Sequence, residues 1–199
     1  MITYRDAINS DMSKVARLHI ACFNGTFIAS LGEKLIATYY LEFLKEGGPF
    51  VLAFDDDKLI GLCMGYYKGS QARNQFISRN KVSLGLRVLG LCLSFNKLAI
   101  SKCWNYLFPA KEKSGVEKPK IEAESDLLSI CVLDSYRGQG VSKRLVEEFE
   151  KRLNKAGKKD VTLAVYTDND RAIAFYKKIG YSIVGEPTDE YKMYKELHK

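Results

Sequence analysis

Apolar and polar positions follow two spacings along this chain, and together they predict short strands alternating with amphipathic helices. Strands are expected at about 1–5, 50–54, 58–67, 121–132, 161–166, 181–184 and 191–196. Helices are expected at about 11–22, 32–45, 142–156 and 171–179, with Ser10 or Asp11 capping the first. The pattern as a whole predicts a mixed α/β sheet with one right-handed parallel crossover, from 127–132 to 161–166.

The segment 68–120 departs from this pattern. Between residues 71 and 110 there is no Asp or Glu, while six Lys or Arg side chains interleave with aliphatic and aromatic ones. An apolar stretch of this length is rarely a bare loop. We therefore expect a helical insertion at about 70–118, with one or two helices over the sheet near its open substrate end. Three roles fit it: an extra packing layer or dimer contact, a lid for an anionic substrate, or a helix on a membrane surface.

Composition bounds the class of protein. A chain of 199 residues with 46% apolar and 28% charged residues can bury one ample core, so a single domain spanning 1–199 is expected. The first residues lack a basic and apolar leader, and no charge-free run approaches the length of a bilayer span, so a cytoplasmic location is expected. The net charge of +7 is modest and no nucleic-acid-binding motif accompanies it, which argues against a nucleic-acid partner.

The cysteines and histidines predict neither disulfides nor a metal site. No Cys-x-x-Cys or Cys/His ligand spacing occurs, and the apolar contexts of the cysteines are typical of reduced, buried thiols. His19 on the first expected helix and His198 near the chain end are not expected to act as catalytic bases. The five cysteines are Cys22, Cys63, Cys92, Cys103 and Cys131.

The most informative local feature is the turn Arg137-Gly138-Gln139-Gly140-Val141-Ser142. It stands between the apolar run 127–133 and the amphipathic run 143–153, so a strand leads through a glycine-rich turn into a helix. Such a turn points successive backbone N–H groups and a helix N-terminus at one spot, which suits a pyrophosphate. The spacing matches neither the P-loop nor the dinucleotide-binding fingerprint. A phosphate-binding turn of another kind is therefore predicted.

Two motifs in the chain resemble those of one enzyme family. The first is Arg137-x-x-Gly140-x-Ser142, and about thirty residues later come Asn-Asp-Arg-Ala at 169–172 and Tyr-x-x-x-Gly-Tyr at 176–181. Together they resemble the two acetyl-CoA motifs of the GCN5-related N-acetyltransferases (GNAT). One departure is Ser142, which stands where the family usually has Gly or Ala and whose side chain can crowd or hydrogen-bond a phosphate.

The resemblance implies a GNAT-type mixed sheet, splayed at its centre and flanked by helices, with the basic insertion before the central strand. It also implies acetyl-CoA as co-substrate and no metal. Backbone groups of Ile130 and Val132, with Cys131 between them, are expected to bind the pantetheine arm, and a local bulge to aim an N–H at the thioester oxygen. Asn169 is expected to hydrogen-bond the arm. The pyrophosphate is expected on the turn: Arg137, Gly138, Gln139, Gly140, Val141 and Ser142.

Acetyl transfer needs a base, because an amine with a pKa near 10.4 is mostly protonated at pH 7. The resemblance points to a carboxylate on the strand before the turn. Asp126 stands where a Glu is common, and Glu124 shares its strand face by the period of two; the alternative is that both are solvated at the strand entry. Tyr176 corresponds to the tyrosine that faces the sulfur and protonates the leaving thiolate, and its alternative role is core packing. Tyr181 is expected to pack.

These expectations describe an N-acetyltransferase that moves an acetyl group from acetyl-CoA to the primary amine of a small molecule, by direct attack in a ternary complex. Residues 31–34 and the basic insertion look similar to bacterial acetyltransferases of sugar and surface-polysaccharide pathways, so an amino sugar is one candidate acceptor. Two alternatives stay open, a catalytically silent acyl-CoA-binding module and an acetyltransferase of protein or peptide amines. A homodimer also stays open.

Overall fold

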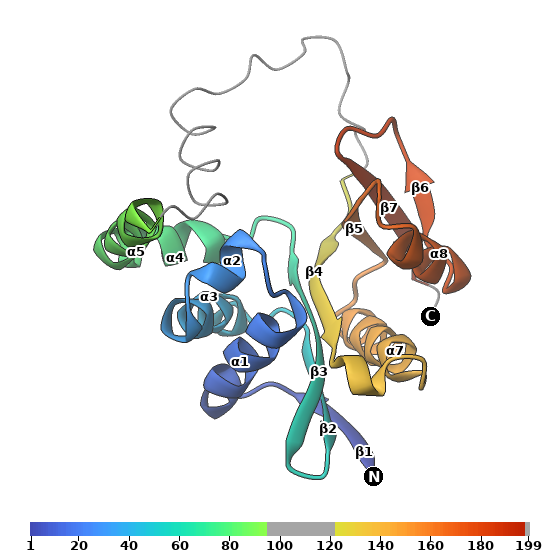
Figure 1. Cartoon of the computed structure of the whole chain (residues 1–199). Coiled ribbons are helices and arrows are strands. Elements are labelled where there is room, and N and C mark those ends of the chain that lie inside the picture. Colours follow the sequence, from blue (N-terminus) through green and yellow to red (C-terminus); the bar gives the residue numbers. More distant parts are fainter. Residues whose placement is uncertain (95–121, 198–199) are drawn as a thin grey trace. The chain divides into compact units, whose positions relative to one another are not determined.

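The computed structural model describes residues 1–94 and 122–197 (Figure 1). The chain divides into two compact units. The first consists of Met1–Ala7, Gly47–Ser70 and Val116–Lys199, and the second of Ile8–Glu46 and Gln71–Gly115. The sequence predicted a single domain and did not indicate two units. That the chain forms one domain stays a prediction.

A seven-stranded sheet forms the frame of the first unit, in the order β1-β2-β3-β4-β5-β7-β6. Neighbouring strands are antiparallel except β4 and β5, whose connection contains a helix, as a parallel crossover requires. The strands are β1 (Ile2–Asp6), β2 (Phe50–Asp55), β3 (Lys58–Tyr67), β4 (Ser125–Val132), β5 (Asp160–Tyr166), β6 (Ser182–Val184) and β7 (Glu190–Glu196).

The sheet is splayed between its two parallel strands. β4 and β5 are in register only at Asp126↔Thr162 and Leu127↔Leu163. β4 nevertheless continues to Val132, where it is still paired with Gly61 of β3. The two parallel strands therefore separate beyond Leu127, and Figure 1 shows them diverging. The centrally splayed mixed sheet expected from the motifs is confirmed.

Helix α7 (Val141–Lys155) packs on the sheet through one apolar face. Its fully buried Phe149 lies against Gly65 of β3, where an added Cβ would come 2.7 Å from a ring carbon of Phe149 and 2.2 Å from the backbone oxygen of Asp126. Glycine at this position therefore allows the close approach of β3 to both β4 and α7. The buried residues of α7 are Val141, Leu145, Val146, Phe149 and Leu153.

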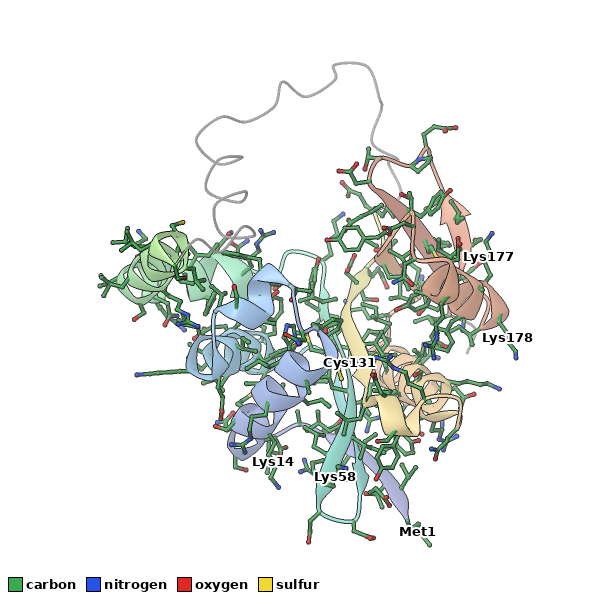
Figure 2. All side chains as sticks on the ribbon, in the orientation of Figure 1. Met1, Lys14, Lys58, Cys131, Lys177 and Lys178 are labelled. Atoms are coloured by element: carbon green, nitrogen blue, oxygen red, sulfur yellow. The ribbon has the colours of Figure 1, made fainter. Side chains whose placement is uncertain are left out.

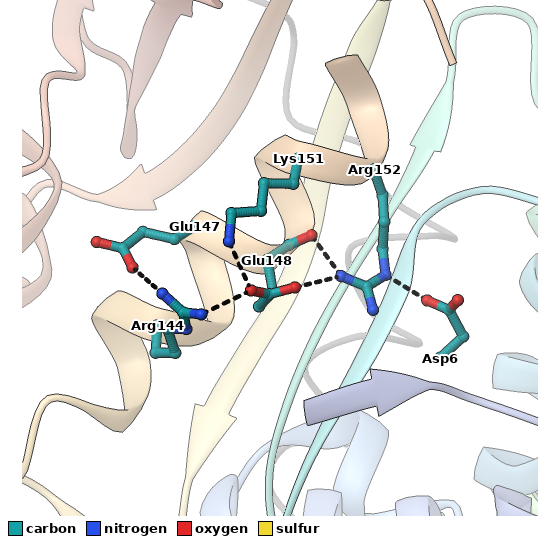
Figure 3. A network of polar contacts seen from close by, with 6 residues as sticks. All are labelled: Asp6, Arg144, Glu147, Glu148, Lys151 and Arg152. Atoms are coloured by element: carbon teal, nitrogen blue, oxygen red, sulfur yellow. Dashed lines mark hydrogen bonds and ion pairs between the residues drawn. The ribbon is translucent and has the colours of Figure 1, made fainter. Parts of the chain in front are cut away.

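The outer face of α7 carries a network of charges centred on Glu148 (Figure 3). Its carboxylate accepts from Lys151 at 2.9 Å, lies 3.1 Å from Arg144 and pairs with Arg152 at 3.0 Å. The hydrogen bond from Lys151, together with that from Arg152, lowers the pKa of Glu148. Arg152 also donates to Asp6 of β1, so the network ties α7 to the first strand of the sheet.

The remaining helical segments of the first unit are η2 (Asp134–Tyr136), a 3-10 turn before α7, and α8 (Asp170–Lys178). α8 follows β5 and buries Ile173 and Tyr176 in the core of this unit. The order of β5, α8, β6 and β7 matches the predicted end of the chain.

The second unit is helical. Within it, α1 packs on α3, and the buried carboxylate of Glu42 on α3 accepts from Lys45 at 3.0 Å and from Arg79 at the end of α4. That pair of contacts joins α4 to α3. Its segments are η1 (Asn9–Asp11), α1 (Met12–Cys22), α2 (Phe27–Ser30), α3 (Glu33–Lys45), α4 (Ala72–Arg79) and α5 (Lys81–Leu93).

Most predicted elements are confirmed, with three differences. β4 begins at Ser125, and Glu124 before it is in contact with Lys159 and Asp160 as well as with the N–H of Lys68. Asp11 stands at the N-cap position of α1, but its carboxylate accepts from the N–H of Ile8 at 2.9 Å. The short helix α2 has no apolar period and was not predicted from the sequence.

The predicted insertion is helical where the structure describes it. α4 and α5 account for 72–79 and 81–93, and they follow one another directly. Residues 95–121 lie outside the described residues, and with them the rest of the insertion and Cys103. His198 lies outside them as well.

Candidate active site

The edge of β4 that faces β5 is open beyond Leu127. Leu133 donates its N–H to the carbonyl of Ile60 at 2.9 Å, so the odd-numbered residues here point their backbone groups at β3. Because the direction alternates along a strand, the backbone groups of Ile130 and Val132 point to the opposite edge of β4. At this level β5 is no longer paired with β4. The backbone of Cys131 points to β3, and its thiol is buried on β4 (Figure 2).

A bulge lies in β4 immediately before this open edge. On β3 the successive residues Met64 and Gly65 pair with Ser129 and Leu127, so Leu128 is the extra residue. A bulge re-aims the backbone next to it. The break falls two residues before Ile130, close to where a bulge is expected.

The turn from 137 to 142 places an uncapped helix end beside the open edge of β4. Gly138 and Gly140 have φ of 79° and 81°, a left-handed conformation that favours glycine. Gly140 is the N-cap residue of α7, and no side chain caps the helix. The N–H groups of the first turn are therefore left without an intrahelical acceptor, and the helix dipole adds a partial positive charge. Such an end binds an anion.

Two side chains of the turn brace it internally. The Arg137 guanidinium lies 2.7 Å from the Asp134 carboxylate, and its Nε donates to the carbonyl of Val132 at 3.3 Å. Gln139 donates to the carbonyl of Ser135 at 2.9 Å. Both side chains thus hold the shape of the turn, and the backbone is what it presents to a ligand. A phosphate contact of Arg137 stays a prediction.

Asp126 lies at the point where β4 and β5 part. It is one of the two β4 residues in register with β5, and Thr162, its register partner, donates its hydroxyl to Asp126 Oδ2 at 2.9 Å. Partial burial raises the pKa of Asp126 to about 6, against the opposing effects of Thr162 and Lys192. A carboxylate with a pKa near neutrality is suited to accept a proton at physiological pH.

Glu124 has a different environment. Its Oε2 accepts from the N–H of Lys159 at 2.8 Å, and its own N–H donates to Asp160 Oδ1 at 2.7 Å. These contacts fasten the residue before β4 to the start of β5. Glu124 is thus engaged in holding the two strands together, and Asp126 is the better placed of the two carboxylates.

Tyr176 extends from α8 into the core of the first unit, and it is 6% exposed. Burial raises the pKa of Tyr176, with a further contribution from the Cys63 thiol on β3, so the phenol keeps its proton at pH 7. Cys63 is the register partner of Ile130. Tyr176 and Cys63 belong to the same buried core of this unit.

Tyr181 packs against Tyr176, as expected. The ring centroids are 5.6 Å apart at an interplanar angle of 65°, and Tyr181 is 3% exposed. Among the described residues its hydroxyl has no hydrogen-bond partner. Tyr181 thus supports the ring of Tyr176 from one side.

Asn169 is the N-cap residue of α8. Its Oδ1 accepts from the N–H of Ala172 at 3.1 Å, which is the usual work of an asparagine at this position. This contact uses only the oxygen of the side-chain amide. Its two N–H groups are donors that a ligand can use. Its expected contact with the pantetheine arm stays a prediction.

Thr162 and Cys63 are the site residues that the sequence patterns missed. Thr162 stands in the apolar run of β5, and a buried hydroxyl in such a run is the signal that it has a polar partner. Cys63 carries no comparable signal, because its position opposite Ile130 depends on the register of β3 and β4.

No metal ligands accompany these groups. The parts of the chain that the structure describes contain no group of three or more His, Cys, Asp or Glu side chains placed to hold a metal ion. His19 is buried on α1, with Nδ1 2.8 Å from the Tyr40 hydroxyl, and burial lowers the pKa of His19 to about 4. Its imidazole is neutral at pH 7 and belongs to the packing of the second unit.

Comparison with protein families gives one match on the part of the chain that carries these features. Residues 112–181 match the acetyltransferase (GNAT) family. The matched segment, residues 112–181 of a chain of 199, is similar to that family. The match extends over the open strand, the glycine turn and α8, including Tyr176 and Tyr181. The family that this segment matches consists of acetyltransferases, which need no metal.

One similar curated protein is an uncharacterized protein of Mycobacterium leprae. It is 40% identical over 62 residues, which are 31% of this chain and 16% of the relative. The comparison therefore covers a small part of that protein.

Solved structures share the whole fold at low identity. The PaiA N-acetyltransferase of Thermoplasma acidophilum, in complex with coenzyme A, has a TM-score of 0.60 at 16% identity, over 98% of this chain and 99% of that one. The ribosomal-protein-S18-alanine N-acetyltransferase of Escherichia coli has a TM-score of 0.61 at 15% identity, over 100% and 96%. Naa20 of Chaetomium thermophilum, in complex with a bisubstrate analogue, has 0.55 at 20% identity, over 98% and 86%.

The residues of this site fit a coenzyme A molecule. An uncapped helix end with two left-handed glycines suits the pyrophosphate, and the open edge of β4 suits an extended arm with amide groups. Ser142 lies in the first turn of α7 and is half-buried, and its expected effect on a phosphate stays a prediction.

Proposed function

We propose that this protein transfers an acetyl group from acetyl-CoA to the primary amine of a small molecule, by direct attack in a ternary complex. The observation that carries the proposal is Asp126, a carboxylate with a pKa of about 6 at the point where β4 and β5 part. A bound coenzyme arm on the open edge of β4 would extend toward the same point.

We assign each group that the reaction needs to a residue in the described part of the chain. The neutral fraction of the amine attacks the acetyl carbon, and the nitrogen, positively charged in the tetrahedral adduct, then loses its proton to the Asp126 carboxylate. The C–S bond breaks, the electron pair stays on sulfur, and the hydroxyl of Tyr176 gives that sulfur its proton. A backbone N–H beside the Leu128 bulge stabilises the oxyanion in between. Solvent then restores the proton of Tyr176 and takes the proton from Asp126.

The acceptor class rests on the sequence more than on the fold. The acid-free basic segment and the resemblance of residues 31–34 favour a small amine that carries anionic groups, such as an amino sugar on a phosphorylated carrier. One of the similar structures is named for a ribosomal-protein acceptor, and another, Naa20, holds a bisubstrate analogue. A protein or peptide amine is therefore the second candidate acceptor.

The test is release of free thiol from acetyl-CoA against a panel of amines that includes amino sugars and short peptides. The proposal predicts amine-dependent release, and the preferred amine identifies the acceptor class. Tyr176→Phe should lower kcat by about 10²- to 10⁴-fold with little change in the Kd for acetyl-CoA, because it removes the general acid and leaves the ring in place. Tyr181→Phe is the matched control, and its kcat should stay close to that of the wild type.

Two results would contradict the proposal. Binding of acetyl-CoA without amine-dependent release would indicate a silent acyl-CoA-binding module. Equal effects of Tyr176→Phe and Tyr181→Phe would show that Tyr176 serves packing alone.

A further inference from the structure

Helix α5 exposes a row of aliphatic side chains to solvent. None of its 13 residues is buried, although a surface helix normally packs its apolar positions on its own protein. We call this row the aliphatic stripe. Its members are Val82, 75% exposed, Leu86, 66%, Leu89, 56%, and Leu93, 71%.

The spacing of the aliphatic stripe places it on one face of the helix. Its members follow one another at intervals of four, three and four residues, which keeps them on one line of an α-helix. The half-buried Leu84, Val88 and Leu91 fall on the opposite side. Gly85 and Gly90 border the aliphatic stripe, and an added Cβ at either would meet nothing within 4 Å. The two charged residues of α5, Lys81 and Arg87, lie outside this face.

Polar contacts within the second unit hold α5 in this orientation. Arg87 donates to the carbonyl of Ser30 through Nε at 3.0 Å and through Nη2 at 2.8 Å. Just before α5, Arg79 at the end of α4 pairs with the buried Glu42. The aliphatic stripe takes no part in either contact, and no hydrogen bond or ion pair within the described part of the chain involves its side chains.

The charge around the aliphatic stripe selects an anionic partner. From residue 71 to residue 94 the chain has no acidic side chain, and the charged residues of α4 and α5 are all Lys or Arg. Arg73 and Lys81 are exposed there. An anionic surface would meet no like charge on these helices.

A second copy of the chain fits this face less well. The aliphatic stripe offers four side chains, whereas a stable protein interface uses about 20–30 residues from each partner. Two copies would also bring two basic, acid-free segments together. A lipid surface has neither problem, because it accepts single aliphatic side chains and supplies negative charge.

The length of α5 excludes a spanning helix. Its 13 residues extend about 20 Å, and a bilayer core is about 30 Å thick. Among the described helices, none has the length and hydropathy needed to cross a membrane. A helix of this kind lies in the plane of the interface.

We infer that α5 docks the protein on an anionic lipid surface, with the aliphatic stripe inserted among the acyl chains and Lys81 at the headgroups. This partner is independent of the acetyl-transfer chemistry, which belongs to the first unit. Docking would keep the protein at a membrane that carries acidic phospholipids.

The test is co-sedimentation of the full chain with phosphatidylcholine vesicles, either pure or containing about one third phosphatidylglycerol. The wild type should partition onto the anionic vesicles and be released by salt. The double variant Leu86→Gln/Leu89→Gln keeps good helix formers on an exposed face and should lower the partition constant at least about tenfold. Lys81→Ala should lower it about fivefold. Ile8→Gln, at an exposed position outside the aliphatic stripe, is the matched control and should bind like the wild type.

Circular dichroism and thermal melting show whether each variant is folded, and the Lys81 variant keeps the test open if the double variant is not. Three outcomes would overturn the inference. They are no binding of the wild type to anionic vesicles, equal binding of wild type and folded double variant, and a dimer in sedimentation velocity that the double variant converts to monomer. The last would assign the aliphatic stripe to a second copy.

Discussion

Helices α7 and α5 each leave one surface open, but the two surfaces differ in kind. α7 buries five apolar side chains and covers its outer face with ion pairs, and its open surface is the uncapped N-terminus. α5 buries none of its residues, and its open surface is the aliphatic stripe. Open N–H groups favour an anion, and an open aliphatic face favours an apolar phase.

The difference shows that overall hydrophobicity does not indicate what a helix binds. α7 is the more polar helix, and its apolar residues are consumed by the core. What decides the ligand is the group that packing leaves without a partner. By this criterion α7 serves the proposed coenzyme site, and α5 serves a surface.

The largest contrast should appear in stability when one apolar side chain is truncated on each helix. Phe149→Ala on α7 removes a fully buried ring and should cost about 3–5 kcal/mol of unfolding free energy. Leu89→Ala on α5 removes a side chain that is 56% exposed and should change it by less than about 0.5 kcal/mol. Urea denaturation followed by circular dichroism measures both.

Similar losses for the two variants would break the comparison. They would mean that the aliphatic stripe is packed in solution, and the lipid-docking inference would lose its basis as well.

A smaller contrast should appear when a methyl group is added beside each helix. Gly65→Ala forces a Cβ against the Asp126 carbonyl and the Phe149 ring, and overpacking of this kind costs about 1–3 kcal/mol. Gly85→Ala on α5 meets no neighbour within 4 Å and should stabilise the helix by about 0.5–1 kcal/mol. The same denaturation series checks both, and destabilisation by Gly85→Ala would reveal a neighbour that α5 lacks in the structure.

The elements of the first unit were accessible from sequence because local spacing determines them. The hairpin of β2 and β3 follows an acidic turn, α7 follows a glycine turn, and both motifs of the coenzyme site are contiguous in the chain. Asp126 was chosen from the family resemblance, since it lies on the strand before the turn, and its catalytic role stays a prediction.

Non-local features could not be read from the sequence. The hydrogen bond from Thr162 to Asp126, the position of Cys63 opposite Ile130 and the bracing role of Arg137 all depend on strand register or turn shape. Glu124 illustrates the limit of periodicity. The period of two places it with Asp126, but its contacts to Lys159 and Asp160 give it a different role.

The central claim is that Asp126 accepts the proton of the amine, and the pH dependence of kcat/KM tests it most directly. The carboxylate must be ionised to act, so kcat/KM of the wild type should fall as the pH drops through about 6, the raised pKa of Asp126. Asp126→Asn can keep the contact with Thr162 but cannot accept a proton. It should lower kcat by about 10²- to 10⁴-fold and remove this acidic limb. Ionisation of the amine contributes equally to both profiles, so only their difference is assigned to Asp126. An unchanged limb in Asp126→Asn, at a rate near that of the wild type, would contradict the account.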